Sequence, residues 1–243
     1  MKSAYFISDI HLGSHTGCSS GKRLELLLDF LVTIKADASH LFIVGDLFDF
    51  WFEYMTVVPR GHFELLFALR KLREQGVEIR MLRGNHDFWI NSFFEEELGI
   101  PLNDDYLDIE LDGKRFYISH GDGLAEDDKG YRLLKRILRS PFNIKLFRLI
   151  HPDLGHALAT FSSKLSRDHG PGRDDREDYA RFARTLFQKG YDCVVLGHTH
   201  APALLHEGRH VYLNTGDWMT VFTYGKFSGG ELTLEHWPHG DNR

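Results

Sequence analysis

The chain has 243 residues, of which 42% are hydrophobic, and this is enough apolar material for one domain with a proper core. Its formal net charge of −6 argues against a general nucleic-acid binder, because such proteins are usually basic. Asp9 comes before any apolar signal region develops, and no stretch has the roughly 18 apolar residues of a spanning helix. We expect a single domain over residues 1–243 that resides in the cytoplasm and binds no nucleic acid.

The first predicted elements form a β-α-β unit. Short apolar runs at 4–8 and 41–44 are typical of buried strands, and apolar residues at helical spacing over 22–35 connect them. A second helix over 62–75 leads to a third strand over 77–82. This alternation predicts a sheet that is at least partly parallel, with helices packed on it.

Polar side chains follow the ends of these strands. Asp9 and His11 follow the first strand, and in an extended segment residues two apart point the same way, so we expect them to aim at one point. Asp46 follows the second strand directly after a glycine. Ligands of open α/β sheets bind at this carboxyl edge, which makes it the expected site.

The third strand ends in the sequence Gly-Asn-His-Asp. Asn85 offers an amide oxygen to a cation, while His86 and Asp87 suggest a pair in which the carboxylate fixes the imidazole tautomer. After it, Ser92 and Glu95 have the spacing of a capping box for a short helix.

A predicted hairpin comes next. Its strands, 107–111 and 115–119, flank an Asp-Gly turn signal, and the second strand ends at His120. Later in the chain a helix over 176–189 leads to a buried strand over 193–196, which ends at His198 and His200. A short strand over 211–213 and edge strands within 224–237 complete the expected elements.

Residues 123–175 depart from this rhythm and predict an inserted helical lid. The segment 129–152 holds seven Lys and Arg residues and no acidic residue, with apolar residues interleaved. Such a basic amphipathic segment is typical of a membrane surface or a phosphate contact. The alternative is a helix pair that packs its apolar face on the core and leaves its charges in solvent.

The polar residues at the strand ends make a set that is too large for one ion: Asp9, His11, Asp46, Asn85, His120, His198 and His200. They suit two divalent ions that share one carboxylate, a pair that can activate water and neutralise a phosphoryl group. With four imidazoles and no thiolate, the set is too rich in nitrogen for a dedicated Mg²⁺ or Ca²⁺ site. The donor set leaves Mn²⁺, Fe²⁺, Co²⁺ and Zn²⁺ open as the bound ions.

Five motifs in this order, DIH, GDLFD, GNHD, HGD and GHTH, resemble those of the calcineurin-like metallophosphoesterases. The resemblance implies an α/β fold of four layers, a helix-sheet-sheet-helix sandwich. It implies that one ion is held by Asp9, His11, Asp46 and His200 and the other by Asp46, Asn85, His120 and His198. It also implies that Asn85, His86 and Asp87 are catalytic: Asn85 contacts the phosphate, His86 donates to the phosphate or protonates the leaving oxygen, and Asp87 supports His86 from behind.

Within the family, the GDLFDFW and HGD segments and the basic insertion are similar to a branch of the lipid A pathway. That branch hydrolyses UDP-2,3-diacylglucosamine to lipid X and UMP with Mn²⁺, as a peripheral protein on the cytoplasmic face of the inner membrane. The implied substrate contacts are Asn85, His86, Asp128, Tyr131, Lys164, Arg167 and His198.

Two other functions stay open at this point. His86 stands where the best-known members of that branch have arginine, so the same chemistry on a soluble phosphodiester, nucleotide or phosphoprotein is an alternative. A fold retained as a binding scaffold is the other, although such scaffolds usually lose ligands. An apolar cavity between the insertion and the metal residues would favour the lipid substrate, and a narrow polar one would favour a soluble substrate.

Overall fold

The computed structural model describes residues 2–124, 129–168 and 176–238. It contains two β-sheets, and the first has the order β11-β10-β1-β2-β3-β4. The strands of this six-stranded sheet are β1 (Ser3–Ile7), β2 (Ala38–Val44), β3 (Glu78–Leu82), β4 (Leu102–Asn103), β10 (Thr223–Ser228) and β11 (Glu231–His236). The five-stranded second sheet has the order β5-β6-β7-β9-β8, with β5 (Leu107–Leu111), β6 (Lys114–Ser119), β7 (Cys193–Leu196), β8 (Ala203–Glu207) and β9 (His210–Asn214).

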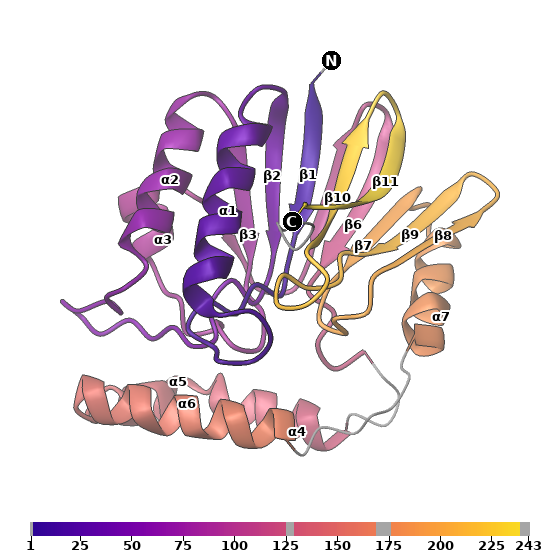
Figure 1. Ribbon diagram of the computed structural model, residues 1–243. Helices are drawn as coiled ribbons and strands as arrows, with labels where there is room; N and C mark the ends of the chain where they lie inside the picture. The colour runs from indigo at the N-terminus through magenta and orange to yellow at the C-terminus, as the bar shows by residue number, and fades with distance from the viewer. Residues whose placement is uncertain (1, 125–128, 169–175, 239–243) are drawn as a thin grey trace.

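Helices cover the outer faces of both sheets. Figure 1 shows α1 and α2 over the first sheet and α7 beside the second. The helices of the described residues are α1 (Ser20–Ile34), α2 (Phe63–Glu74), α3 (Phe93–Leu98), α4 (Lys129–Leu138), α5 (Pro141–Phe147), α6 (Pro152–Asp168) and α7 (Arg176–Phe187). The predicted β-α-β unit is confirmed, since β1 and β2 pair in parallel as neighbours around α1.

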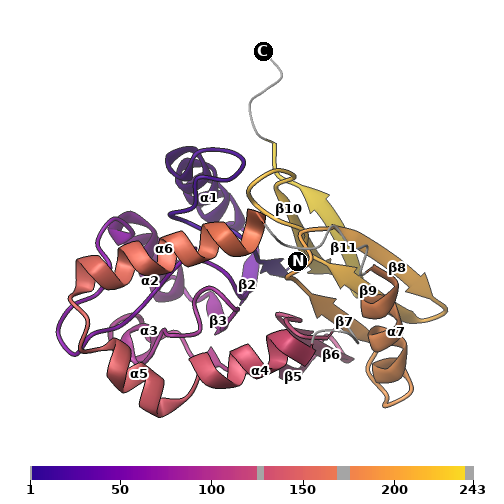
Figure 2. The same cartoon turned by 90° about the horizontal axis from the view of Figure 1, so that it is seen from below.

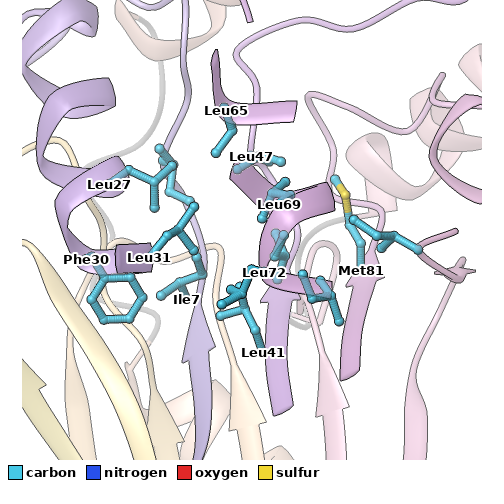
Figure 3. Close-up of a cluster of buried hydrophobic side chains, with 14 of the residues drawn as sticks. Ile7, Leu27, Phe30, Leu31, Leu41, Leu47, Leu65, Leu69, Leu72 and Met81 are labelled. Carbon is cyan, nitrogen blue, oxygen red and sulfur yellow. The ribbon is translucent and has the colours of Figure 1, made fainter. Parts of the chain in front are cut away.

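Strand residues alternate between two cores, as the two-residue period of a strand requires. Ile7 and Leu41 face α1 and α2, where they meet Leu27, Leu69 and other apolar residues of the helices (Figure 3). Phe6 faces the second sheet instead, and its ring stacks on that of Phe42 with centroids 5.0 Å apart. The first sheet is therefore buried on both faces.

The second sheet is also covered on both faces. Its inner face packs against the first sheet through residues such as Phe116 and Val195. Its outer face carries Val194 and Tyr212, which pack with Ala183 of α7. The order of layers is therefore helix, sheet, sheet, helix, and the predicted four-layer fold is confirmed.

Two local features differ from the sequence expectations. Strands β4 and β8 were not predicted, because β4 has two residues and β8 has only three apolar residues before His206 and Glu207, with three of its five residues exposed. The predicted capping box does not form: Ser92 makes no side-chain cap, and Glu95 accepts from Leu102 N at 3.1 Å instead. By contrast, the Asp112-Gly113 turn of the hairpin forms as predicted, with positive φ at both residues.

The helices α4, α5 and α6 make a separate layer below one end of both sheets (Figures 1 and 2). They lie within the predicted insertion of residues 123–175, whose parts 125–128 and 169–175 are outside the described residues. In the part of the chain that the structure describes, no helix has the length and apolar character needed to cross a membrane.

The core between the sheets should dominate stability. We expect Phe6→Ala to lower the free energy of unfolding by about 3–5 kcal/mol, because Phe6 is fully buried and packs against Phe42 and Phe116. Urea unfolding followed by circular dichroism measures this. Val32→Ala on α1 is the control, since Val32 is 72% exposed and should change stability by less than about 0.5 kcal/mol. Equal effects of the two substitutions would contradict this assignment of the core.

Candidate metal centre

The carboxyl ends of five strands meet above the α4 to α6 layer. Strands β1, β2 and β3 run parallel in the first sheet, and β6 and β7 run parallel in the second. Each releases polar side chains at the same edge, where the two sheets face one another. The seven predicted metal ligands follow these five strands: Asp9, His11, Asp46, Asn85, His120, His198 and His200.

Five of these residues have a left-handed backbone. The φ angles are 52° for Asp9, 47° for His11, 54° for Asp46, 70° for His198 and 56° for His200. The expectation that Asp9 and His11 meet because their segment is extended is therefore wrong in its reason. They do meet, with His11 Nε2 at 3.7 Å from Asp9 Oδ1, but through tight turns that point both side chains to the same spot.

Asp46 lies between the histidines of the two sheets. Its Oδ2 is 3.6 Å from His11 Nε2 and 3.3 Å from His120 Nε2. Its Oδ1 accepts a hydrogen bond of 2.8 Å from the backbone N–H of His86. One carboxylate oxygen is thus fixed by the chain, and the other is directed at both groups of ligands.

Asp9 is held in a similar way. Its Oδ2 accepts hydrogen bonds from the hydroxyl of Ser8 and from the backbone N–H of His198. Its Oδ1 has no hydrogen-bond partner and lies 3.4 Å from His200 Nε2. The unpartnered oxygen of this fully buried carboxylate therefore points at the cluster.

His120 and Asn85 form the other part of the cluster. Because the carbonyl of Val44 can only accept, His120 Nδ1 donates to it at 2.9 Å, and this orients Nε2 toward the site. His120 Nε2 lies 3.0 Å from Asn85 Oδ1, and the His198 ring lies next to that of His120 with centroids 5.1 Å apart. With Asp46, four side chains converge here from four strand ends.

Glycines make this close approach possible. A Cβ on Gly45 would lie 2.5 Å from His120 Nδ1, and Gly45 itself has a φ of 85°. A Cβ on Gly84 would lie 2.5 Å from the backbone nitrogen of Asp46. The glycines of the GDLFD and GNHD motifs therefore leave room for the ligands of a neighbouring strand.

The cluster is rich in buried charge that the protein alone does not balance. Burial opposes charging of both histidines, yet the pKa of His11 rises to about 9 beside Asp49 and Asp9, and that of His120 to about 10 beside Asp46. Burial also acts against ionised Asp46, but the charge of His120 holds its pKa well below the usual range. Burial and His120 lower the pKa of His198 to about 4. These shifts show that the buried carboxylates favour positive charge beside them.

These residues fit divalent metal ions. Among the described residues, three groups have ligand atoms that all lie within 4.8 Å of one another: Asp9 with His11 and His200, His11 with Asp46 and His86, and Asp46 with His120 and His198. Buried atoms without hydrogen-bond partners, such as Asp9 Oδ1 and His11 Nε2, are what a bound cation would satisfy. Imidazole and carboxylate donors without thiolate suit Mn²⁺, Fe²⁺, Co²⁺ or Zn²⁺.

The carboxylate beside His86 is Asp49, not Asp87 as the sequence suggested. His86 Nδ1 donates to the Asp49 carbonyl at 3.1 Å and lies 3.6 Å from its carboxylate, which also lies 3.7 Å from His11 Nδ1. Asp87 accepts instead from the backbone N–H groups of Gly84 and Leu47, each at 2.8 Å. Asp87 therefore joins the loops after β3 and β2.

Sequence reasoning also missed supports for the ligands. Asp217 Oδ2 lies 3.7 Å from His200 Nδ1, and its other oxygen accepts from the N–H of Met219 at 2.8 Å. Asp49 is the last residue of the GDLFD motif, and Asp217 lies three residues after the end of β9. Neither spacing shows which imidazole the carboxylate would meet, because the contacts depend on how the two sheets are placed.

A cavity of about 380 Å³ lies beside His86 and Asn85 and is also lined by residues of the helices α4 to α6. Apolar side chains line most of it: Phe50, Phe88, Trp89, Leu134, Leu138, Phe147, Leu158 and Ala159. Of the remaining predicted substrate contacts, Tyr131 lines this cavity. Asp128 and the side chains of Lys164 and Arg167 lie outside the described part of the structure, and His198 stands among the metal ligands.

Comparison with known proteins agrees with this geometry. The family model for calcineurin-like phosphoesterases matches residues 3–202. Proteins named UDP-2,3-diacylglucosamine hydrolase are similar along most of the chain. The protein of Porphyromonas gingivalis is 33% identical, with 95% of this chain and 96% of its own length aligned. Those of Neisseria meningitidis serogroup B and Haemophilus influenzae are 34% and 29% identical, with 90% of this chain and 90% and 91% of their own lengths aligned.

The division of roles between Asp46 and His86 can be tested. We expect Asp46→Asn to lower the content of bound divalent metal and to reduce hydrolysis of an aryl phosphodiester more than 100-fold. Replacing a residue that only supports a metal ligand typically lowers metal affinity or activity about 10–100-fold, and Asp46 is expected to be a ligand itself. The amide oxygen can still accept from His86 N, so the loop should keep its form. His86→Gln should slow turnover but keep the metal.

Elemental analysis after dialysis gives the metal content of both variants. Asp29→Asn is the control, because Asp29 is exposed on α1 and far along the chain from the cluster. If Asp46→Asn and His86→Gln lost metal equally, the separate roles would be contradicted.

Proposed function

Because this chain belongs to the calcineurin-like phosphoesterase family, we propose that it hydrolyses the diphosphate of UDP-2,3-diacylglucosamine. The products are 2,3-diacylglucosamine 1-phosphate and UMP. Relatives at 33% and 34% identity carry the name of this activity over nearly their whole length. The alternative of a small soluble substrate is less well supported by the shape of the site.

The observation that carries the proposal is the apolar cavity between the metal ligands and helices α4 to α6. Its volume of about 380 Å³ is within the range of ligand pockets, and its lining is mostly aromatic and aliphatic. Its lining combines polar Asn85 and His86 of the loop after β3 with apolar Phe147, Leu158 and Ala159 of α5 and α6. A substrate with phosphate at one end and acyl chains at the other matches this division.

We assign two divalent ions to the cluster, most simply Mn²⁺, with Asp46 shared between them. One set is Asp9, His11, Asp46 and His200, and the other is Asp46, Asn85, His120 and His198. Bound ions of this kind lower the pKa of water and neutralise developing phosphoryl charge. The position of Asp46 Oδ2 between His11 and His120 supports the shared role.

The remaining residues act on the phosphate in this proposal. Asn85 offers its amide, and His86 is held by its Nδ1 hydrogen bond to the Asp49 carbonyl at 3.1 Å. Burial lowers the pKa of His86, although the charge of Asp46 acts against this shift. The negative charge of a bound diphosphate favours the charged form, in which both ring nitrogens donate. His86 then binds the phosphate at the position where related enzymes have arginine.

We infer that the helices α4 to α6 act as a lid that also meets a membrane surface. Large apolar side chains on this layer are exposed to solvent, among them Phe142 at 73%, Leu149 at 83% and Leu154 at 61%. Exposed apolar residues interleaved with basic ones are typical of proteins bound at anionic membrane surfaces. The lid therefore places the cavity beside the lipid from which a diacyl substrate comes, on the cytoplasmic face of the inner membrane.

The direct test is product release. Purified protein with Mn²⁺ should release UMP from detergent-dispersed UDP-2,3-diacylglucosamine, and chelation of the metal should abolish the activity. Liquid chromatography of the nucleotide products measures this. If the protein cleaved aryl phosphodiesters but released no UMP, the substrate assignment would be wrong and the soluble alternative would replace it.

Filling the cavity should separate acyl binding from phosphate chemistry. Ala159 lines the cavity on α6, so Ala159→Trp should raise KM for the diacyl substrate about 10-fold or more. Hydrolysis of an aryl phosphodiester should change less than about 2-fold, because the strand ends are untouched. Ala157→Trp on the same helix is the matched control, since Ala157 is exposed and does not line the cavity. Equal effects of the two substitutions would exclude the cavity as the acyl site.

A further inference from the structure

One face of α4 brings cationic and hydroxyl groups to the polar end of the cavity. Tyr131, Lys135 and Arg139 are spaced four residues apart, so they lie on the same side of the helix, and all three line the cavity with Asn85 and His86. The other residues of α4 that line it, Leu134 and Leu138, are apolar. Lys135 thus stands where the polar and apolar parts of the cavity meet.

Asp122 fixes Lys135 in this place. Its Oδ2 is 2.7 Å from Lys135 Nζ and accepts a hydrogen bond of 2.7 Å from Tyr131 OH. Asp122 is only 6% exposed and follows the metal ligand His120 by two residues. An ion pair this buried is poorly screened by solvent and joins α4 directly to the strand end that carries His120.

The neighbouring Arg139 is held against the loop after β3. Its Nη2 donates to the Gly84 carbonyl at 3.4 Å, and its guanidinium lies over the Phe88 ring at 5.5 Å. Lys135 has three N–H donors, of which the contact with Asp122 uses one. Lys135 therefore combines positive charge, remaining donors and a fixed position near His86.

We propose that Lys135 binds the phosphate that leaves with the sugar, and that Asp122 is the positioning residue for Lys135. The proposal rests on the proposed function and adds to it a group for the leaving phosphate. A substrate whose acyl chains lie among the lid helices and whose α-phosphorus lies at the metal ligands has its sugar phosphate between these points. Lys135 occupies that part of the cavity wall.

The reaction explains why a cation is needed there. The oxygen of water bonds to the α-phosphorus, the bond from this phosphorus to the bridging oxygen breaks, and the electron pair stays on the departing phosphate. The protons of water pass to solvent. The leaving phosphate thereby goes from one negative charge toward two, and an ammonium beside it stabilises the transition state more than the ground state.

The test compares two substrates. Lys135→Met should lower kcat/KM for UDP-2,3-diacylglucosamine on the order of 100-fold, the loss typical of one charge-stabilising donor. It should leave hydrolysis of bis(p-nitrophenyl) phosphate within about 2-fold, since this diester has no second phosphate. Lys135→Arg should restore part of the diphosphate activity. Arg136→Met is the matched control, because Arg136 is the adjacent exposed cation and does not line the cavity.

The possible results are distinguishable. If the wild-type protein released no UMP, the proposed function would fail and this inference with it. If the wild type released UMP but Lys135→Met slowed both substrates equally, or neither, the inference alone would fail. The aryl diester also reports whether the metal centre of the variant is intact, so loss of folding is recognised.

A double substitution tests the role of Asp122. Asp122→Asn keeps an oxygen that can accept from Tyr131 but removes the charge that holds Lys135. We expect it to lower kcat/KM for the diphosphate substrate, and to cause no further loss when Lys135 is already Met. Additive losses would show that Asp122 acts independently of Lys135 and would overturn its positioning role.

Discussion

Two buried carboxylates impose the constraint on which the rest of this structure depends. Asp9 and Asp46 are 0% and 1% exposed, and His11 Nε2 lies 3.7 and 3.6 Å from their oxygens. Ionised groups removed from water cost several kcal/mol each unless opposite charge and hydrogen bonds compensate. Backbone N–H groups occupy one oxygen of each carboxylate, and imidazoles crowd the other. In our account, divalent ions supply the positive charge that compensates the remaining carboxylate oxygens.

The packed sheets hold the ligands in these unfavourable backbone conformations. Five ligands have positive φ angles, a conformation that costs on the order of 1–3 kcal/mol when residues other than glycine are held in it. Parallel strands with fully buried residues such as Phe6, Ile43 and Val195 fix the ends from which these turns begin. Packing in the sheets thus compensates for the strain at the site. The strand end after β6 also holds the lid, because Asp122, two residues after His120, forms an ion pair with Lys135.

Much of this was readable in the sequence, because short, mainly apolar strands followed within three residues by polar ligands leave a strong local pattern. β1, β2, β3 and β7 were predicted in this way, and the family motifs supplied the two-sheet arrangement. A local sequence pattern does not show how the strands and their loops are placed relative to one another. Asp49 meets His86 because the loops after β2 and β3 turn toward each other, and β8 was missed because only its first three residues are apolar and its last three are exposed. The cavity could be suspected from the basic insertion, but its lining depends on how that insertion lies over the strand ends.

The most direct test of the account is to locate the ions. Crystals grown with Mn²⁺ and measured at the manganese absorption edge give an anomalous difference map in which each ion is a separate peak. We predict two peaks, one among Asp9, His11 and His200 and the other among Asn85, His120 and His198, with Asp46 bound to both. A single peak, or two peaks that Asp46 does not join, would contradict the shared carboxylate on which the mechanism rests.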